Sequence, residues 1–364
     1  MKKITYILLV IICLFFISKA TGATTNEEKE LLIGKVISIE DEVQEEMTSQ
    51  LGEPFYFTNQ ILLVKINRGS LKGKTIEIEN DYVELREGEN FLIVRSVTEQ
   101  GDHFSYPHPL RVMPLLGLIL LFGLVIFLFT RWQGVRSFAT ILLSIGTIIF
   151  YVLPQINKGA SPILVAIFAS LFIITISLYF VYGWNKKTHA AFLGTTTGLF
   201  LTLVLSLVFV ELTRLTGQGS DQAIQIKMFW GDMVNLKDLY LAAIIIGSVG
   251  ALNDVAVDQS STVFAIKKAN PQLNSRDLYR QSVSVGKDHL LATINTLVLA
   301  YVSVSLPLLL IVSSSNNLPI LFLLNNEVFA GEIVRTFLVS LSLLFVTPIT
   351  NLFAVILASR KVKK

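Results

Sequence analysis

Two aspartates close to the end of a strongly apolar segment are the residues best suited to chemistry in this chain. Asp254 and Asp258 are four residues apart, so a helix projects both carboxylates from one face. Charged groups are costly within a bilayer and usually face a protein interior or water. We therefore predict a site for a cation, a proton or a polar substrate, with Asn253 beside it. The competing interpretation is a cytoplasmic helix end whose carboxylates are solvated or pair with Lys267 and Lys268.

Further polar residues follow in two later apolar segments. Asp288 and His289 stand at the predicted start of the sixth segment, and Asn295 follows nearly two turns later. In the simplest interpretation Asp288 caps the helix and His289 lies at the membrane interface. Asn295 is expected deeper, and Asn351 at a similar depth in the seventh segment, where a buried amide needs partners. We expect these groups to share one polar site with Asp254.

Two acid–base pairs lie at the opposite ends of their segments from this site. Glu211 and Arg214, and likewise Glu332 and Arg335, are three residues apart. Such spacing favours local ion pairs at the membrane interface over a ligand site.

Small residues mark surfaces where helices approach closely. Gly247, Gly250 and Ala251 lie on the stripe that carries the two aspartates. Gly194 and Gly198 form a small-xxx-small pattern, which is typical of structural helix packing.

The sequence does not contain the residues that several common kinds of metal, nucleotide or catalytic site require. The chain has one cysteine, Cys13, and four histidines without metal-ligand spacing, so neither a thiolate metal centre nor an intrachain disulfide is expected. No glycine-rich phosphate loop with its lysine occurs. Asp254 and Asp258 on one helical turn are too far apart to share a proton as a protease dyad does, which leaves only Asp254 with Asp288 for that chemistry. We expect no catalytic residue, metal or cofactor.

The composition is that of a membrane protein with segregated charge. The 364 residues are 52% hydrophobic and 16% charged, and the mean hydropathy is +0.62. A soluble domain carries about 25% charged residues. Residues 24–110 hold 17 acidic and eight basic residues, whereas the remainder is basic. This separation indicates sidedness across a membrane and gives no reason to expect a nucleic-acid partner.

The chain divides into three parts. Residues 1–23 resemble a secretory signal peptide or an uncleaved signal anchor. Residues 24–110 alternate apolar and polar side chains between glycine-containing turns, which predicts a small, exported β-barrel-like domain, of the OB type as one guess. Residues 111–364 predict a polytopic α-helical membrane protein with about seven transmembrane helices. These segments are placed at 112–130, 137–153, 162–182, 190–212, 239–258, 289–312 and 333–358.

Basic residues in the loops predict the orientation. With the β-rich domain outside, the predicted cytoplasmic loops and C-terminus carry 13 Lys and Arg, against four in the opposite loops. The positive-inside rule therefore predicts a multi-pass plasma-membrane protein with its C-terminus in the cytoplasm. A short apolar stretch at 318–324 cannot span and would lie at the interface or re-enter the bilayer.

Several of these runs together resemble the YibE/F-like membrane proteins. The similarity rests on residues 250–261, 286–301 with 305–307 after them, and 332–335 through 347–350; Arg136 and residues 159–162 also fit. The exported domain resembles the N-terminal part of the family's longer members. The resemblance implies a bacterial polytopic plasma-membrane protein, often paired with a shorter homologue that lacks the exported domain. It implies no established biochemical activity.

Three functions remain open from the sequence. The leading hypothesis is a transporter or permease-like component, working with the lipid bilayer and with such a homologue. The alternative is a non-transporting scaffold or envelope sensor that acts through the exported domain. An intramembrane enzyme is the third.

Overall fold

The computed structural model describes residues 29–49, 52–81, 83–98, 101–314 and 320–359. These residues fall into two compact units, one ending at Val125 and one beginning at Ile126. The predicted signal segment at 1–23 lies outside the described residues.

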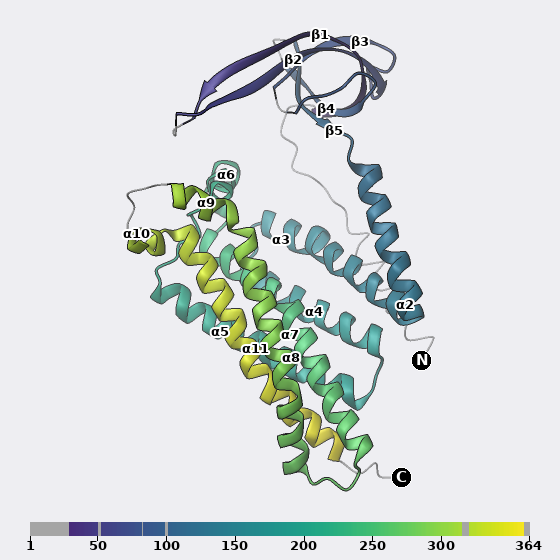
Figure 1. Ribbon diagram of the computed structural model, residues 1–364, viewed down its shortest axis with the longest axis vertical. Helices are drawn as coiled ribbons and strands as arrows, with labels where there is room; N and C mark the ends of the chain where they lie inside the picture. The colour runs from purple at the N-terminus through teal and green to yellow at the C-terminus, as the bar shows by residue number, and fades with distance from the viewer. Residues whose placement is uncertain (1–28, 50–51, 82, 99–100, 315–319, 360–364) are drawn as a thin grey trace. The chain divides into compact units, whose positions relative to one another are not determined.

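The first unit is one antiparallel β-sheet (Figure 1). Its strands are β1 (Lys29–Thr48), β2 (Pro54–Arg68), β3 (Thr75–Asn80), β4 (Asn90–Thr98) and β5 (Gly101–Pro109). Alternate residues such as Leu62, Val64 and Ile66 turn inward and build a core with Leu32 and Phe91, as the period-two pattern predicted. The strand order is β3-β2-β1-β4-β5.

The predicted barrel is not closed. Among the described strands β3 and β5 are the two edges of the sheet, and no backbone pairing joins them. Three register shifts in the β1–β2 ladder break its regular pairing, and bulges of this kind bend a strand. The strand signal in the sequence was therefore right, but an OB-like closed barrel is not shown.

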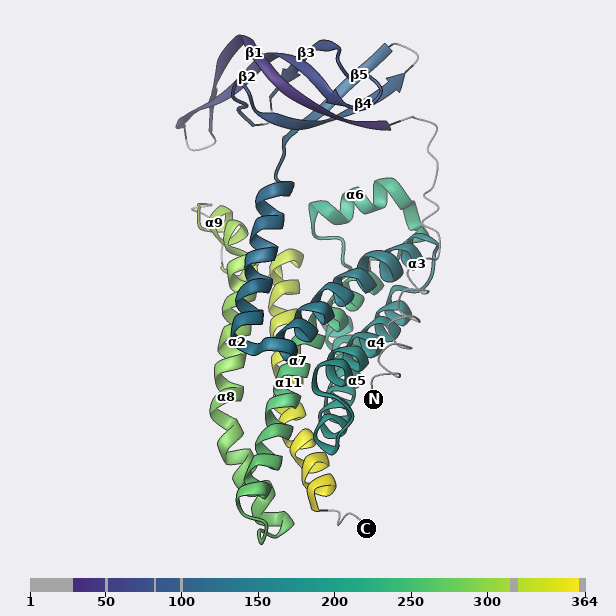
Figure 2. The same ribbon diagram turned by 90° about the vertical axis from the view of Figure 1, so that its right-hand side faces the viewer.

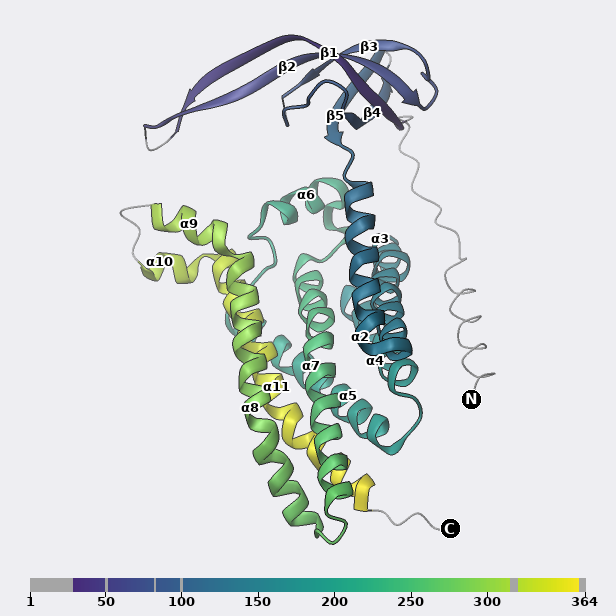
Figure 3. The ribbon, with the colours of Figure 1, turned by 45° about the vertical axis from the view of Figure 1, so that its right-hand side comes forward.

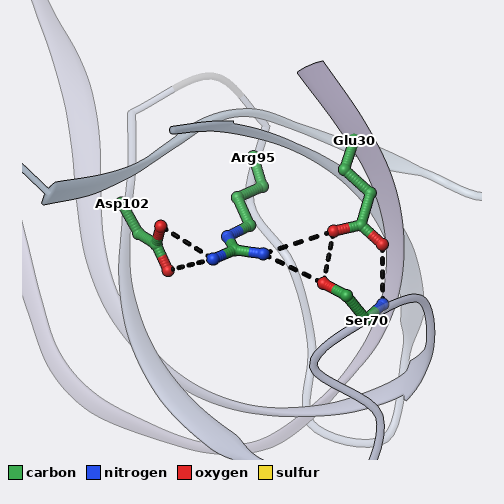
Figure 4. Close-up of polar contacts among 4 residues, drawn as sticks. All are labelled: Glu30, Ser70, Arg95 and Asp102. Atoms are coloured by element: carbon green, nitrogen blue, oxygen red, sulfur yellow. Dashed lines mark hydrogen bonds and ion pairs between the residues drawn. The ribbon is translucent and has the colours of Figure 1, made fainter. Parts of the chain in front are cut away.

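An arginine at the centre of four polar contacts ties the open sheet together (Figure 4). Arg95 on β4 lies opposite Glu30 on β1 in register, and its Nη1 lies 3.4 Å from the Glu30 carboxylate. The same Nη1 donates to the Ser70 hydroxyl at 2.9 Å, and Nη2 donates to Asp102 on β5 at 2.8 Å. Ser70, in the turn after β2, donates its backbone N–H to Glu30 at 2.6 Å. These contacts fix three strands and a turn in one register.

Acid should loosen this contact network. Hydrogen bonds from the hydroxyl and then the backbone N–H of Ser70 hold the pKa of Glu30 below its ordinary value of 4.5. The Glu30 carboxylate therefore stabilises the fold above the unfolded pKa, and this contribution disappears as the pH falls through the lower folded pKa. Amide hydrogen exchange in β1 and β4, corrected for its intrinsic pH dependence, should speed up below about pH 4.5. Glu30→Gln should flatten this pH dependence of exchange, while Glu40→Gln, at an exposed position, should leave it unchanged. The same pH dependence of exchange in both variants would contradict this role for Glu30.

The second unit is a bundle of long helices (Figure 2). Its elements are α2 (Val112–Thr147, which begins in the first unit), η1 (Ile148–Val152), α3 (Leu153–Asn157), α4 (Pro162–Tyr182), α5 (Lys186–Leu212), α6 (Asp221–Trp230), η2 (Gly231–Met233), α7 (Leu236–Ala269), α8 (Ser275–Val304), α9 (Leu306–Ser314), α10 (Ile320–Asn325) and α11 (Glu327–Ser359).

Five stretches of the described helices are long and apolar enough to cross a membrane. They are Val112–Asn157, α4, α5, α7 and α11. The first two predicted segments fall within the first stretch, which is kinked at Arg131, where φ is 51° and ψ is −133°. The sixth predicted segment falls on α8 and α9, which are not among the five. The structure therefore supports a membrane-helix bundle but does not establish seven crossings.

Asparagine side chains set where three of the helices begin. The side chains of Asn185, Asn235 and Asn274 each accept a backbone N–H three residues on, at 2.9, 3.2 and 2.8 Å. This satisfies one of the free donors of a first turn. As a result α8 begins at Ser275, and the prediction that Asp288 caps this helix is wrong, because Asp288 stands in the helix interior.

Helix α7 is at the centre of the bundle (Figure 3). Its apolar residues share one core with residues from α4, α5, α8 and α11, including Leu252 and Val255. Helix α5 also packs directly on α11 at the predicted glycine pair. A β-carbon on Gly194 would lie 2.0 Å from Thr350 Oγ1, and one on Gly198 would lie 2.1 Å from Val346 Cγ2.

Adding a methyl group at this contact should destabilise the bundle. We expect Gly198→Ala to lower the free energy of unfolding by about 1–3 kcal/mol, because the two helices must separate to make room. Gly250→Ala is the matched control, since a β-carbon there meets no atom within 4 Å. Thermal unfolding in detergent would compare the two variants. Equal melting temperatures would show that α5 and α11 do not pack in this way.

Candidate functional site in the membrane helices

One face of α7 is left open by the other described helices and carries the first predicted carboxylate. Asp254 is exposed there, as are Gly247 and Gly250, while Asp258 is half-buried. Nothing lies within 4 Å of a β-carbon built on Gly250, and only the Tyr301 hydroxyl, at 3.7 Å, approaches one on Gly247. The stripe of small residues therefore leaves space beside Asp254, and the structure does not fill that space with another described helix.

Groups on two other helices come within electrostatic range of Asp254. His289 on α8 and Tyr182 at the end of α4 both interact with it electrostatically. The charge of Asp254 on α7 is thus within electrostatic range of an imidazole on α8.

A second polar group is buried on the other side of α7. The Asn351 amide on α11 donates to Gln259 Oε1 at 3.0 Å, and Gln259 Nε2 donates to the Gly286 carbonyl on α8 at 3.2 Å. Both amides are fully buried. The close approach at Gly286 is required, because a β-carbon there would lie 2.1 Å from Gln259. This amide chain joins α11, α7 and α8.

Two further hydrogen bonds connect α7 to its other neighbours. Asn253 is buried and donates to the Ser177 hydroxyl on α4 at 2.9 Å. Ser260 donates to the Lys187 carbonyl, in the first turn of α5, at 2.7 Å. The Oδ1 atoms of Asn253 and Asn351 are buried without a partner among the described residues. Buried acceptors of this kind call for a partner such as water.

The residues predicted to form one site are therefore distributed over different surfaces. Asp254 and His289 are both exposed and interact electrostatically, whereas Asn351 contacts Gln259 in the interior. Asp288 and Asn295 are exposed on α8. The common depth expected from the sequence does not by itself put side chains on the same face of a helix.

A separate polar cluster lies at the end of the bundle where α7 and α11 begin. Arg335 Nη1 lies 3.1 Å from Glu332 Oε1, and the guanidinium lies 5.3 Å from the centre of the Tyr240 ring. The Tyr240 hydroxyl donates to the Gly331 carbonyl at 2.5 Å. The carboxylate of Glu327 accepts the backbone N–H groups of Thr216 and Gly217 at 2.6 Å each, although Thr216 and Glu327 are 111 positions apart. A cavity of about 110 Å³ adjoins these groups, beside a larger one of about 490 Å³ that Arg214 helps to line.

The predicted ion pair between Glu211 and Arg214, near this cluster, is wrong. Glu211 forms its ion pair with Lys237 at the start of α7 and not with Arg214. Arg214 lies beyond the end of α5 with φ of 52°, outside the helical spacing on which the prediction depended.

Sequence reasoning missed the residues that connect the helices. Gln259 was passed over although it directly follows Asp258, and a glutamine within an apolar helix is itself a signal of a buried amide contact. Tyr240 and Glu327 gave no comparable signal, because their partners are distant in the sequence. Within the described ranges, no three His, Cys, Asp or Glu residues gather as metal ligands would.

Comparison with known families covers both units. The model of the YibE/F-like protein family matches residues 118–360, and that of the YibE/F family N-terminal domain matches residues 29–87. Searches of curated proteins and of solved structures returned no match. Since the first family model covers more than half of the chain and several of its helices could cross a membrane, the structure and the comparison agree with the resemblance found in the sequence. The chain belongs to the YibE/F-like family of membrane proteins.

Proposed function

We propose that this protein is a transporter component of the bacterial plasma membrane, in which the open face of α7 binds a cation, a proton or a polar substrate. The observation that carries the proposal is Asp254. Within the described part of the chain, no lysine or arginine forms an ion pair with this carboxylate. Since a carboxylate without a basic ion-pair partner is costly in a membrane helix, its presence there favours a functional role.

The surroundings of Asp254 support binding over simple packing. Gly247 and Gly250 leave room beside the carboxylate, and His289 provides a second group that can carry a proton. The buried amide chain through Gln259 holds α7 against α8 and α11, so the two helices that carry Asp254 and His289 are fixed relative to each other. A binding site needs such rigid support for its contacting groups.

Seven crossings are part of the proposal. The run Val112–Asn157 has 46 residues, which is about 69 Å of helix, more than twice the roughly 30 Å of a bilayer core. The kink at Arg131 would divide it into two crossings. Helix α8 would be the sixth, because it runs beside α7 and α11 and shares their core through Leu290 and Ile294.

The proposed orientation puts the basic end of the bundle in the cytoplasm. Ser260 contacts Lys187, and Ser275 contacts Ser359, so the start of α5, the start of α8 and the end of α11 gather at one end. Lys186, Lys187, Lys267 and Lys268 belong to this end. By the positive-inside rule it faces the cell interior, and the β unit is exported.

Cysteine labelling would test the orientation. In a Cys13→Ser background, we expect Gln222→Cys on α6 to react with a membrane-impermeant maleimide in intact cells. Lys268→Cys at the end of α7 should react only after the cells are permeabilised. The reverse pattern would place the basic end outside and overturn the proposed topology.

Flux measurements in liposomes would test the transport itself. Purified protein should move at least one member of a panel of protons, alkali cations and small polar solutes faster than protein-free vesicles do. Co-reconstitution with the shorter homologue would show whether a partner is needed. Flux no faster than in protein-free vesicles for every member of the panel, with and without the partner, would reject the proposal.

A further inference from the structure

The first unit carries a projecting two-stranded ribbon that the transport proposal does not use. Beyond the core of the sheet, residues 43–48 of β1 pair with residues 54–59 of β2. The other described strands pair with β1 only at 29–35 and with β2 only at 60–65. Figure 3 shows this ribbon extending away from the rest of the sheet. An isolated two-stranded ribbon is only marginally stable in water, so its persistence calls for a covering surface.

One face of the ribbon is mostly apolar. Residues directly opposite each other in an antiparallel pair share a face, and alternate residues return to it. Phe55 and Phe57 therefore lie on the same face as Met47 and Val43, and the centres of the two phenylalanine rings are 5.4 Å apart, edge to face. Glu45, directly opposite Phe57, and Asn59, opposite Val43, lie on this face as well. The four apolar side chains are between 40% and 49% exposed. Contiguous exposed apolar groups of this kind are typical of protein interaction sites.

The charged residues of this part of the sheet are all acidic. From Val36 to Val64 the chain has no lysine or arginine. The six acidic residues of this stretch are Glu40, Asp41, Glu42, Glu45, Glu46 and Glu53. The surface thus combines apolar side chains with carboxylates on and around them, all of one charge, which steers association toward a partner of the opposite charge.

We propose that this ribbon is a docking surface for another envelope protein, one that presents an apolar groove bordered by lysine and arginine. The negative charge of the ribbon argues against two other binding partners, a lipid surface and a second copy of this chain. Anionic lipid headgroups repel these carboxylates, since membrane surfaces attract basic segments. Two ribbons meeting face to face would bring their carboxylates together, and like charges across an interface oppose binding.

Photocrosslinking in the full-length protein would test this surface. A benzophenone amino acid at Phe57 should give adducts in living cells, and mass spectrometry should assign them to a different protein, at an apolar segment flanked by Lys or Arg. The same crosslinker at Val97, an exposed residue on β4, is the control and should give no such adduct. The combined substitution of Asp41→Lys and Glu45→Lys, two residues on the face of Phe57, should weaken binding to the identified protein about tenfold or more, while Asp41→Asn with Glu45→Gln should have a smaller effect.

Three results would overturn the docking proposal. Adducts with lipid would identify a membrane surface, and adducts with the chain itself would identify a second copy. A yield that is unchanged by the charge-reversing substitutions would remove the role of the carboxylates. Correct folding of each variant would be checked by hydrogen exchange in β4, since its partner residues lie outside the ribbon.

Discussion

Asp254→Asn is expected to reduce flux through the reconstituted protein by roughly tenfold or more, which is the largest functional effect that the structure predicts for a single substitution. Asparagine keeps the shape of the side chain but can neither carry a negative charge nor take up a proton reversibly. Because Asp254 is exposed on the open face of α7 and supports no other helix, its replacement should leave the melting temperature in detergent unchanged. Initial rates in liposomes for the solute that the wild-type protein moves would provide the measurement.

The matched control is Asp238→Asn, the same substitution on the same helix, in its first turn. It should keep wild-type flux, because Asp238 lies at the other end of α7 from His289. His289→Ala should also lower flux, since this imidazole interacts with the carboxylate across the helix interface. Equal flux in wild type and in Asp254→Asn would remove the central residue from the proposed site, whatever the protein transports.

The largest effect on stability is expected from Gln259→Leu. This change leaves the Asn351 amide without its acceptor and removes the donor to the Gly286 carbonyl, both within the bundle core. The Asn351 amide that loses its acceptor costs about 1–3 kcal/mol. The Gly286 carbonyl keeps its hydrogen bond within α8, but a branched leucine fits poorly at this close contact, which costs about 1–3 kcal/mol more. We therefore expect a loss of about 2–6 kcal/mol in the free energy of unfolding, measured by thermal or denaturant unfolding in detergent.

A double substitution distinguishes the hydrogen bond from packing. Adding Asn351→Leu to Gln259→Leu removes both amides, and replacing both partners by apolar groups is often close to neutral. The double variant should therefore recover part of the stability that Gln259→Leu lost. A double variant with the summed loss of both single variants would show that these amides do not act as a pair.

The sequence predicted well those features that depend on local periodicity. Alternating residues such as Leu62, Val64 and Ile66 predicted strands, and they do build the sheet core. Gly194 and Gly198 predicted a close helix contact, which α5 makes with α11. Both patterns are fixed by the repeat of a single strand or helix, so no knowledge of distant residues was needed.

Features that depend on two distant segments could not be predicted in this way. Sequence spacing predicts that Glu211 pairs with Arg214, but the chain leaves the helical conformation at Arg214, and Glu211 pairs with Lys237 instead. Sequence pattern also predicts a helix start at Asp288, whereas an asparagine cap sets that start at Asn274. Whether the sheet closes into a barrel likewise depends on pairing between its edge strands β3 and β5, which the local sequence pattern of a strand does not predict.

The sequence by itself determined that apolar helices follow an acidic β-rich domain, and that Asp254 stands on a stripe of small residues. Only the tertiary structure decided that this stripe stays open while Gln259 and Asn351 are buried together on another side of α7. The physical reason is that periodicity places a residue on one face of its own helix, whereas the packing of the neighbouring helices decides which of those faces is covered.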